Sequence, residues 1–91
     1  MITYKISLFF PENAESSINE LRDDHLRYIR SKKNIRFGGI ARTNANHYSE
    51  IVYIISCSNI DEAEQFVFND PYSKIVESYR VNQFEQKIPN Y

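Results

Sequence analysis

The hydrophobic pattern of this 91-residue chain changes its period several times, and these changes limit the folds that are open to it. In residues 2–10 the even-numbered positions are apolar and the odd-numbered positions are mostly polar, which is typical of a strand with one buried face. In residues 13–34 the apolar positions recur at helical spacing instead. A chain that switches between these periods must combine strands and helices in one small core.

The rest of the sequence repeats this switch. Residues 35–42 and 47–57 have strand patterns, residues 59–69 have a helical pattern, and residues 77–88 have a strand pattern again. The apolar parity shifts between Val81 and Phe84, which indicates a bulge or a change of buried face. The order β-α-β-β-α-β predicts one ferredoxin-like α+β domain over residues 1–91, with a four-stranded antiparallel sheet and two helices on one face.

Helix starts are marked by polar side chains. Ser17 followed by Glu20 is a capping-box pattern for the first helix, and Asn13 offers an earlier start. Asn59 with Glu62 predicts the start of the second helix.

Two helices on one face leave the other face of the sheet uncovered. The alternation in residues 35–42 groups Ile35 with Phe37 and places Ile40 on the opposite side. We expect Ile40, Val52 and Ile54 to be exposed on the uncovered face. Because a monomer rarely leaves such a patch open, the pattern predicts a homodimer that packs through this face.

Composition excludes several classes of protein. The net charge is −1, and Cys57 is the single cysteine, so we expect neither an internal disulfide nor a zinc site. We predict no metal, no cofactor and no membrane span, and the alternating start of the chain does not resemble a signal peptide. These features predict a cytoplasmic protein.

Residues 25–49 contain no acidic side chain, and we interpret this stretch as a solvated basic face. Its cations could instead attract an anion or nucleic acid, but the near-neutral net charge argues against a nucleic-acid partner. The basic residues are Arg27, Arg30, Lys32, Lys33, Arg36 and Arg42.

The candidate chemistry centres on His25 and Asp70. His25 lies on the apolar stripe of the first helix, where it is either a core histidine or a group that moves protons near neutral pH. Asp70 precedes Pro71, an arrangement that is typical of a helix cap, and one carboxylate can cap with one oxygen while the other accepts from His25. Candidate substrate-binding residues nearby are Gly38, Gly39, Tyr72, Ser73 and Arg36.

Three short motifs resemble the YCII-related (YciI-like) family of the dimeric α+β barrel superfamily. They are "HLRYI" in the first helix, "FGG" in the second strand and "DPY" after the second helix. The resemblance implies that His25 and Asp70 line a cleft and form an active site. It also implies isomerase- or lyase-like chemistry.

The sequence therefore predicts a small enzyme that uses His25 and Asp70 as a general acid–base pair on a small organic molecule. The alternative is a non-catalytic module of the same fold that binds a small ligand or a partner in the same cleft.

Overall fold

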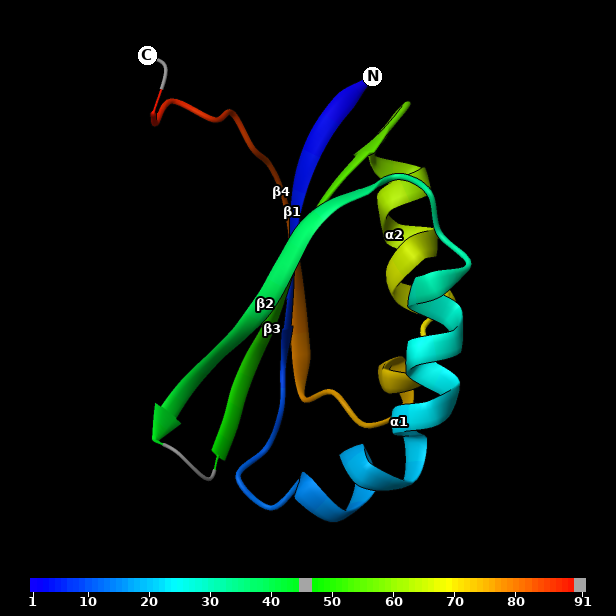
Figure 1. Cartoon of the computed structure of the whole chain (residues 1–91), viewed down its shortest axis with the longest axis vertical. Helices are drawn as coiled ribbons and strands as arrows, with labels where there is room; N and C mark the ends of the chain where they lie inside the picture. Colours follow the sequence, from blue (N-terminus) through cyan, green and yellow to red (C-terminus); the bar gives the residue numbers. More distant parts are fainter. Residues whose placement is uncertain (45–46, 90–91) are drawn as a thin grey trace.

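The computed structural model describes residues 1–44 and 47–89 (Figure 1). The element order confirms the predicted β-α-β-β-α-β arrangement, with one short 3₁₀ helix added before the last strand. The elements are β1 (Ile2–Phe9), α1 (Glu15–Arg30), β2 (Ile35–Asn44), β3 (His47–Cys57), α2 (Ile60–Asn69), η1 (Pro71–Lys74) and β4 (Ser78–Gln83).

The four strands form one antiparallel sheet in the order β2-β3-β1-β4. β1 is central, and its even-numbered residues Tyr4, Ile6 and Leu8 are buried against the helices, as the alternation predicts. Ile6 pairs with Tyr53 on one side and with Val81 on the other, so the two neighbouring strands contribute side chains to the same layer of the core.

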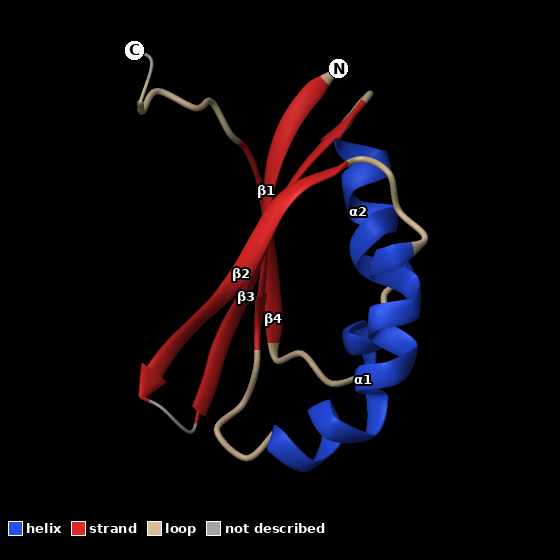
Figure 2. Cartoon of the chain, in the orientation of Figure 1, coloured by secondary structure: helices blue, strands red, loops and turns tan. Residues whose placement is uncertain are grey.

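Both helices cover the same face of the sheet, as Figure 2 shows. The predicted start of α2 is confirmed, since Asn59 Oδ1 accepts a hydrogen bond from the Glu62 N–H at 3.0 Å. The capping box predicted at Ser17 is wrong, because the helix starts earlier in the chain. α1 begins at Glu15 after Ala14, which makes no side-chain cap, and Ser17 lies inside the first turn.

The side chains of β2 also point to other faces of the sheet than predicted, because strict alternation fails at Arg36. The register shifts between Ile35, which pairs with Ile55, and Phe37, which pairs with Ile54. Such a bulge places two successive residues against one residue of the partner strand and reverses the parity that follows. Ile40 consequently pairs with Ile51 on the helix side of the sheet and is not on the uncovered face.

The predicted apolar patch on the uncovered face is therefore wrong for two of its three residues. Ile40 faces the helices, and Ile54 is only 3% exposed because Phe37 and Phe84 line the same hollow around it. Val52 is half-buried on this face, and Phe37 is 57% exposed there. Phe37 is thus the prominent apolar side chain of the uncovered face.

The last strand is shorter than predicted. β4 ends at Gln83, and the Phe84 N–H donates to the Thr3 carbonyl at 2.9 Å where the chain leaves the sheet. The change of parity after Val81 therefore marks the end of the strand. Among the described residues, no helix is long and apolar enough to cross a membrane.

Gly38 is needed because of close packing. It pairs with Tyr53 in the sheet, and a Cβ atom at Gly38 would lie 2.7 Å from the Val52 carbonyl oxygen and 3.1 Å from Cδ1 of Tyr53. A Cβ atom at Gly39 would meet no atom within 4 Å.

We expect Gly38→Ala to lower the free energy of unfolding by about 1–3 kcal/mol, because the strand or the Tyr53 ring must move. Urea unfolding of this variant beside Gly39→Ala measures the effect with a matched control. Equal stability of the two variants would contradict the packing argument.

Candidate functional site

Asp70 is fixed where two helical elements meet. It ends α2 and caps η1, and its Oδ1 accepts a hydrogen bond from the Tyr72 N–H at 2.9 Å. Pro71 follows at the first position of η1, where its missing N–H costs nothing. Asp70 is 1% exposed, so the cap holds a buried carboxyl group in one orientation.

His25 reaches this carboxylate from α1. Its Nδ1 lies 2.8 Å from Asp70 Oδ1, and the imidazole is 7% exposed. The sequence predicts that different oxygens of Asp70 cap the turn and receive His25, but the structure uses Oδ1 for both. Oδ2 is buried and has no hydrogen-bond partner among the described residues.

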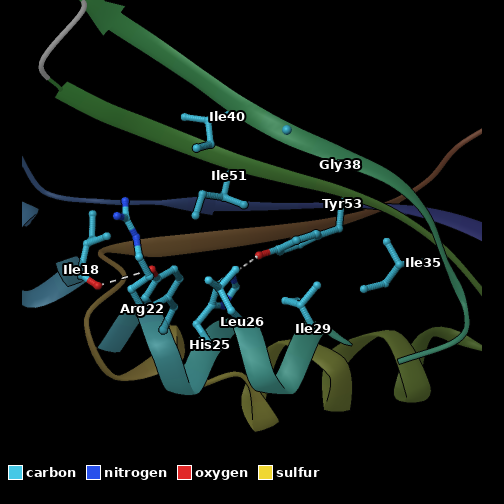
Figure 3. A pocket seen from close by; sticks show the side chains of 12 residues that line it. Ile18, Arg22, His25, Leu26, Ile29, Ile35, Gly38, Ile40, Ile51 and Tyr53 are labelled. Carbon is cyan, nitrogen blue, oxygen red and sulfur yellow. Dashed lines mark hydrogen bonds between the residues drawn. The ribbon is translucent and has the colours of Figure 1, made fainter. Parts of the chain in front are cut away.

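Tyr53 of β3 contacts the other ring nitrogen of His25. Its hydroxyl lies 3.0 Å from His25 Nε2 (Figure 3). An ionised carboxylate only accepts hydrogen bonds, so Nδ1 must carry the proton that points to Asp70. In the neutral ring Nε2 is then an acceptor, and Tyr53 is its donor. Hydrogen bonds therefore connect the three side chains in the order Asp70, His25, Tyr53.

Tyr72 holds the plane of the imidazole. The two rings are stacked with centroids 3.9 Å apart and planes 10° from parallel. The Tyr72 hydroxyl donates to the Ile18 carbonyl at 3.4 Å, and Phe10 packs edge-on against the same ring with centroids 5.6 Å apart. His25 is therefore fixed by hydrogen bonds at both nitrogens and by a stacked ring on its face.

A cavity of about 330 Å³ lies beside this group, between α1 and the β2–β3 half of the sheet. Its walls are mainly apolar, and Gly38 and Gly39 line the β2 side. Figure 3 shows how the labelled side chains surround it. The lining residues that matter for the chemistry are Arg22, His25, Tyr53 and Tyr72.

Arg22 is the permanently charged residue of the lining that the structure describes. It lies one turn before His25 on α1 and extends towards the sheet in Figure 3. A guanidinium at this place can bind a carboxylate or phenolate oxygen of a ligand. Arg22 is not among the site residues predicted from the sequence, although its position three residues before His25 puts both on neighbouring parts of one helix surface.

Burial keeps the phenol of Tyr53 neutral, as it does that of Tyr28 outside the cavity. Burial, with the nearby charge of Asp70, raises the pKa of Tyr53 far above its ordinary value. The same two causes raise the pKa of Tyr28 to about 12. Tyr53 therefore remains a phenol around neutral pH, where it can pass a proton on but does not hold a negative charge.

The structure brings some of the predicted site residues together and leaves others apart. His25 contacts Asp70, and Gly38, Gly39 and Tyr72 line the cavity. Arg36 lines a different hollow on the uncovered face of the sheet. The Ser73 hydroxyl donates to the Phe68 carbonyl at 3.2 Å, and Ser73 is not part of the lining.

Two of the basic residues of 25–49 have separate described partners. Arg27 pairs with the exposed carboxylate of Asp24 at 3.0 Å, while Lys32 lies over the Tyr28 ring at 4.8 Å from its centroid. Among the residues that the structure describes, no three side chains of the kinds that hold metals come together.

The described molecule is thus a ferredoxin-like α+β domain with an Asp–His–Tyr chain beside an apolar cavity. No protein-family model matches the chain, and no curated protein sequence matches it. Several solved structures resemble it, and these likenesses show the α+β fold that the sequence predicts. Membership of the dimeric α+β barrel superfamily and of the YCII-related family stays a prediction.

One similar structure is that of 5-chloro-2-hydroxyhydroquinone dehydrochlorinase (TftG) from Burkholderia phenoliruptrix, in complex with 2,5-dihydroxybenzoquinone. The TM-score is 0.84 at 20% identity, over 94% of this chain and 96% of that chain. A NIPSNAP domain protein from Burkholderia xenovorans has a TM-score of 0.56 at 11% identity, over 97% and 96% of the two chains. A NIPSNAP family protein of unknown function from Agrobacterium tumefaciens has a TM-score of 0.54 at 16% identity, over 93% and 87%.

Proposed function

We propose that this protein is a small enzyme that performs proton-transfer chemistry, of the isomerase or lyase type, on a hydroxylated organic ring. His25 is the acid–base group, and Asp70 orients it and stabilises its protonated form. The observation that carries the proposal is the imidazole held between Asp70 at 2.8 Å and Tyr53 at 3.0 Å beside an apolar cavity. A structural histidine needs no such cavity at its side.

The shape and lining of the cavity support a one-ring ligand. Its volume of about 330 Å³ is at the lower end for small-molecule sites. Apolar walls suit the faces of a ring, and Arg22 with Tyr53 offers polar contacts to ring oxygens. The dehydrochlorinase that this chain resembles binds a dihydroxybenzoquinone, which is a ligand of this kind.

Loss of hydrogen chloride from such a ring fits the same residues. The reaction transfers a proton and expels chloride, so it needs a base beside the ring and a site that limits water. The first substrate to test is therefore 5-chloro-2-hydroxyhydroquinone, with 2,5-dihydroxybenzoquinone as a ligand for binding measurements.

We expect His25→Gln and Asp70→Asn each to lower kcat for chloride release by about 10²–10⁴, because each removes part of one proton-transfer unit. The double variant should be no slower than the slower single variant, since groups that act as a unit lose their effect together. Chloride release and ligand binding are measured on all four proteins.

Additive losses in the double variant would contradict a coupled pair. Binding of 2,5-dihydroxybenzoquinone without turnover of any ring substrate would favour the alternative function, a non-catalytic module that binds its ligand in the same cavity. Circular dichroism of each variant separates loss of chemistry from loss of fold.

Because of Arg22, we propose that the site prefers an anionic ligand. The guanidinium is exposed at the edge of the cavity and stands one turn from the base. As protons leave a hydroxylated ring, negative charge builds on its oxygens, and a cation at this position stabilises it.

Arg22→Gln should raise the Kd of the 2,5-dihydroxybenzoquinone anion about tenfold, or ~1.4 kcal/mol, by removing a charge-assisted contact. Arg30→Gln is the matched control, because it removes the same charge from the exposed end of α1 and does not touch the cavity. Titration calorimetry at two salt concentrations measures both variants. An equal change in both would show that only long-range attraction is at work.

We also propose that two copies of the chain associate through the uncovered face of the sheet. Figure 1 shows both helices on the opposite side. Phe37, 57% exposed, stands on this face beside the half-buried Val52. A small domain gains stability by burying such a face, and a twofold pair is the commonest arrangement.

Light scattering after size exclusion should give a mass twice the 10.8 kDa of the chain. Phe37→Asp should shift it to the monomer mass, because a charge on this face cannot be buried without a partner. Ile60→Asp is the control, since Ile60 is 49% exposed at the start of α2, away from the sheet. A monomeric wild-type protein would contradict the dimer.

A further inference from the structure

Both ring nitrogens of His25 are already engaged in the structure. Nδ1 faces Asp70 at 2.8 Å and Nε2 faces the Tyr53 hydroxyl at 3.0 Å. The imidazole is 7% exposed, and Tyr72 covers its ring with centroids 3.9 Å apart. A ligand in the cavity therefore meets the Tyr53 hydroxyl at the place where it would have to reach Nε2 to exchange a proton with His25.

We propose that Tyr53 is a catalytic residue that relays the proton between a hydroxyl group of the ligand and His25. The inference rests on the proposed function and makes it more specific. It identifies the group that touches the reacting atom, and it restricts the ligand to molecules that carry an ionisable hydroxyl beside the apolar part of the ring.

The relay balances without any further reactant. The ligand O–H bond breaks as a new O–H bond forms on Tyr53. The original Tyr53 O–H bond breaks as an N–H bond forms at His25 Nε2. The products are the ligand anion and an imidazolium beside the Asp70 carboxylate. The reverse sequence returns the proton to a product.

Tyr53 is held firmly enough for this role. Its ring packs edge-on against Phe66, with centroids 5.5 Å apart, and Gly38 leaves the space that the ring fills on the other side. Burial and the charge of Asp70 also disfavour its phenolate. The two proton shifts must therefore be coupled, because a phenolate at Tyr53 does not accumulate as an intermediate.

The neighbouring phenols do not offer the same path. The Tyr72 hydroxyl donates to the Ile18 carbonyl at 3.4 Å, and the Tyr28 hydroxyl donates to the Phe66 carbonyl at 2.7 Å. A backbone carbonyl cannot take up a proton near neutral pH. Of these three phenols, Tyr53 is the one whose hydroxyl lies at a ring nitrogen, which can accept a proton.

The first measurement is the tautomer of His25 in the ligand-free protein, from the ¹⁵N shifts of its two ring nitrogens. The relay requires that the neutral ring carry its proton on Nδ1 and leave Nε2 as the acceptor. A neutral ring with its proton on Nε2 would make Tyr53 the acceptor and would overturn the relay without any variant.

The second measurement uses 4-nitrophenol, whose phenolate is yellow, at a pH where the free compound is mainly protonated. We expect the wild-type protein to bind it as the phenolate. Tyr53→Phe should bind it without the yellow signal and should lower turnover of the hydroxylated ring by about 10²-fold or more. Tyr28→Phe is the matched control and should behave as the wild type.

The outcomes separate the relay from the proposed function. If His25→Gln loses the signal while Tyr53→Phe keeps it, the relay is overturned and direct transfer to His25 remains. If His25→Gln keeps the wild-type signal, or if the wild type gives no signal at saturation, both the proposed function and the relay are contradicted. Thermal unfolding of each variant confirms that the fold persists.

Discussion

The site depends on one oxygen atom, Oδ1 of Asp70, which accepts from both the Tyr72 N–H and His25 Nδ1. The first bond starts η1 and orients the carboxylate, and the second ties this turn to α1. Two segments that are 45 residues apart in the sequence are thereby joined through a buried charge. Loss of the carboxylate would leave a helix end uncapped and the imidazole without its acceptor.

Most of the architecture can be read from the hydrophobic pattern. The strict alternation of residues 2–10 specifies the central strand, and Asn59 with Glu62 specifies where α2 begins. His25 stands out because it occupies an apolar position on a helix, and Asp70 because a proline follows it. Their pairing follows from the fold order together with the resemblance to a family, since periodicity alone cannot bring distant residues together.

The features that sequence reasoning missed depend on tertiary geometry. The bulge at Arg36 follows from how β2 and β3 fit together, and it moves Ile40 into the cavity and Arg36 out of it. In the sequence, Tyr53 fits the pattern of an apolar residue in a buried strand. Nothing in this local pattern reveals that its hydroxyl contacts His25. The one signal in the sequence is Gly38, where a Cβ atom would meet both the Val52 carbonyl oxygen and the Tyr53 ring.

The contacts of the two Asp70 oxygens bear on the direction of proton transfer at the site. Oδ2 is buried and has no hydrogen-bond partner among the described residues, while Oδ1 accepts from both Tyr72 and His25. An imidazolium at His25 would lie 2.8 Å from the Asp70 carboxylate, which would stabilise it when ionised. In the proposed reaction, the proton that the ligand gives up would complete this ion pair.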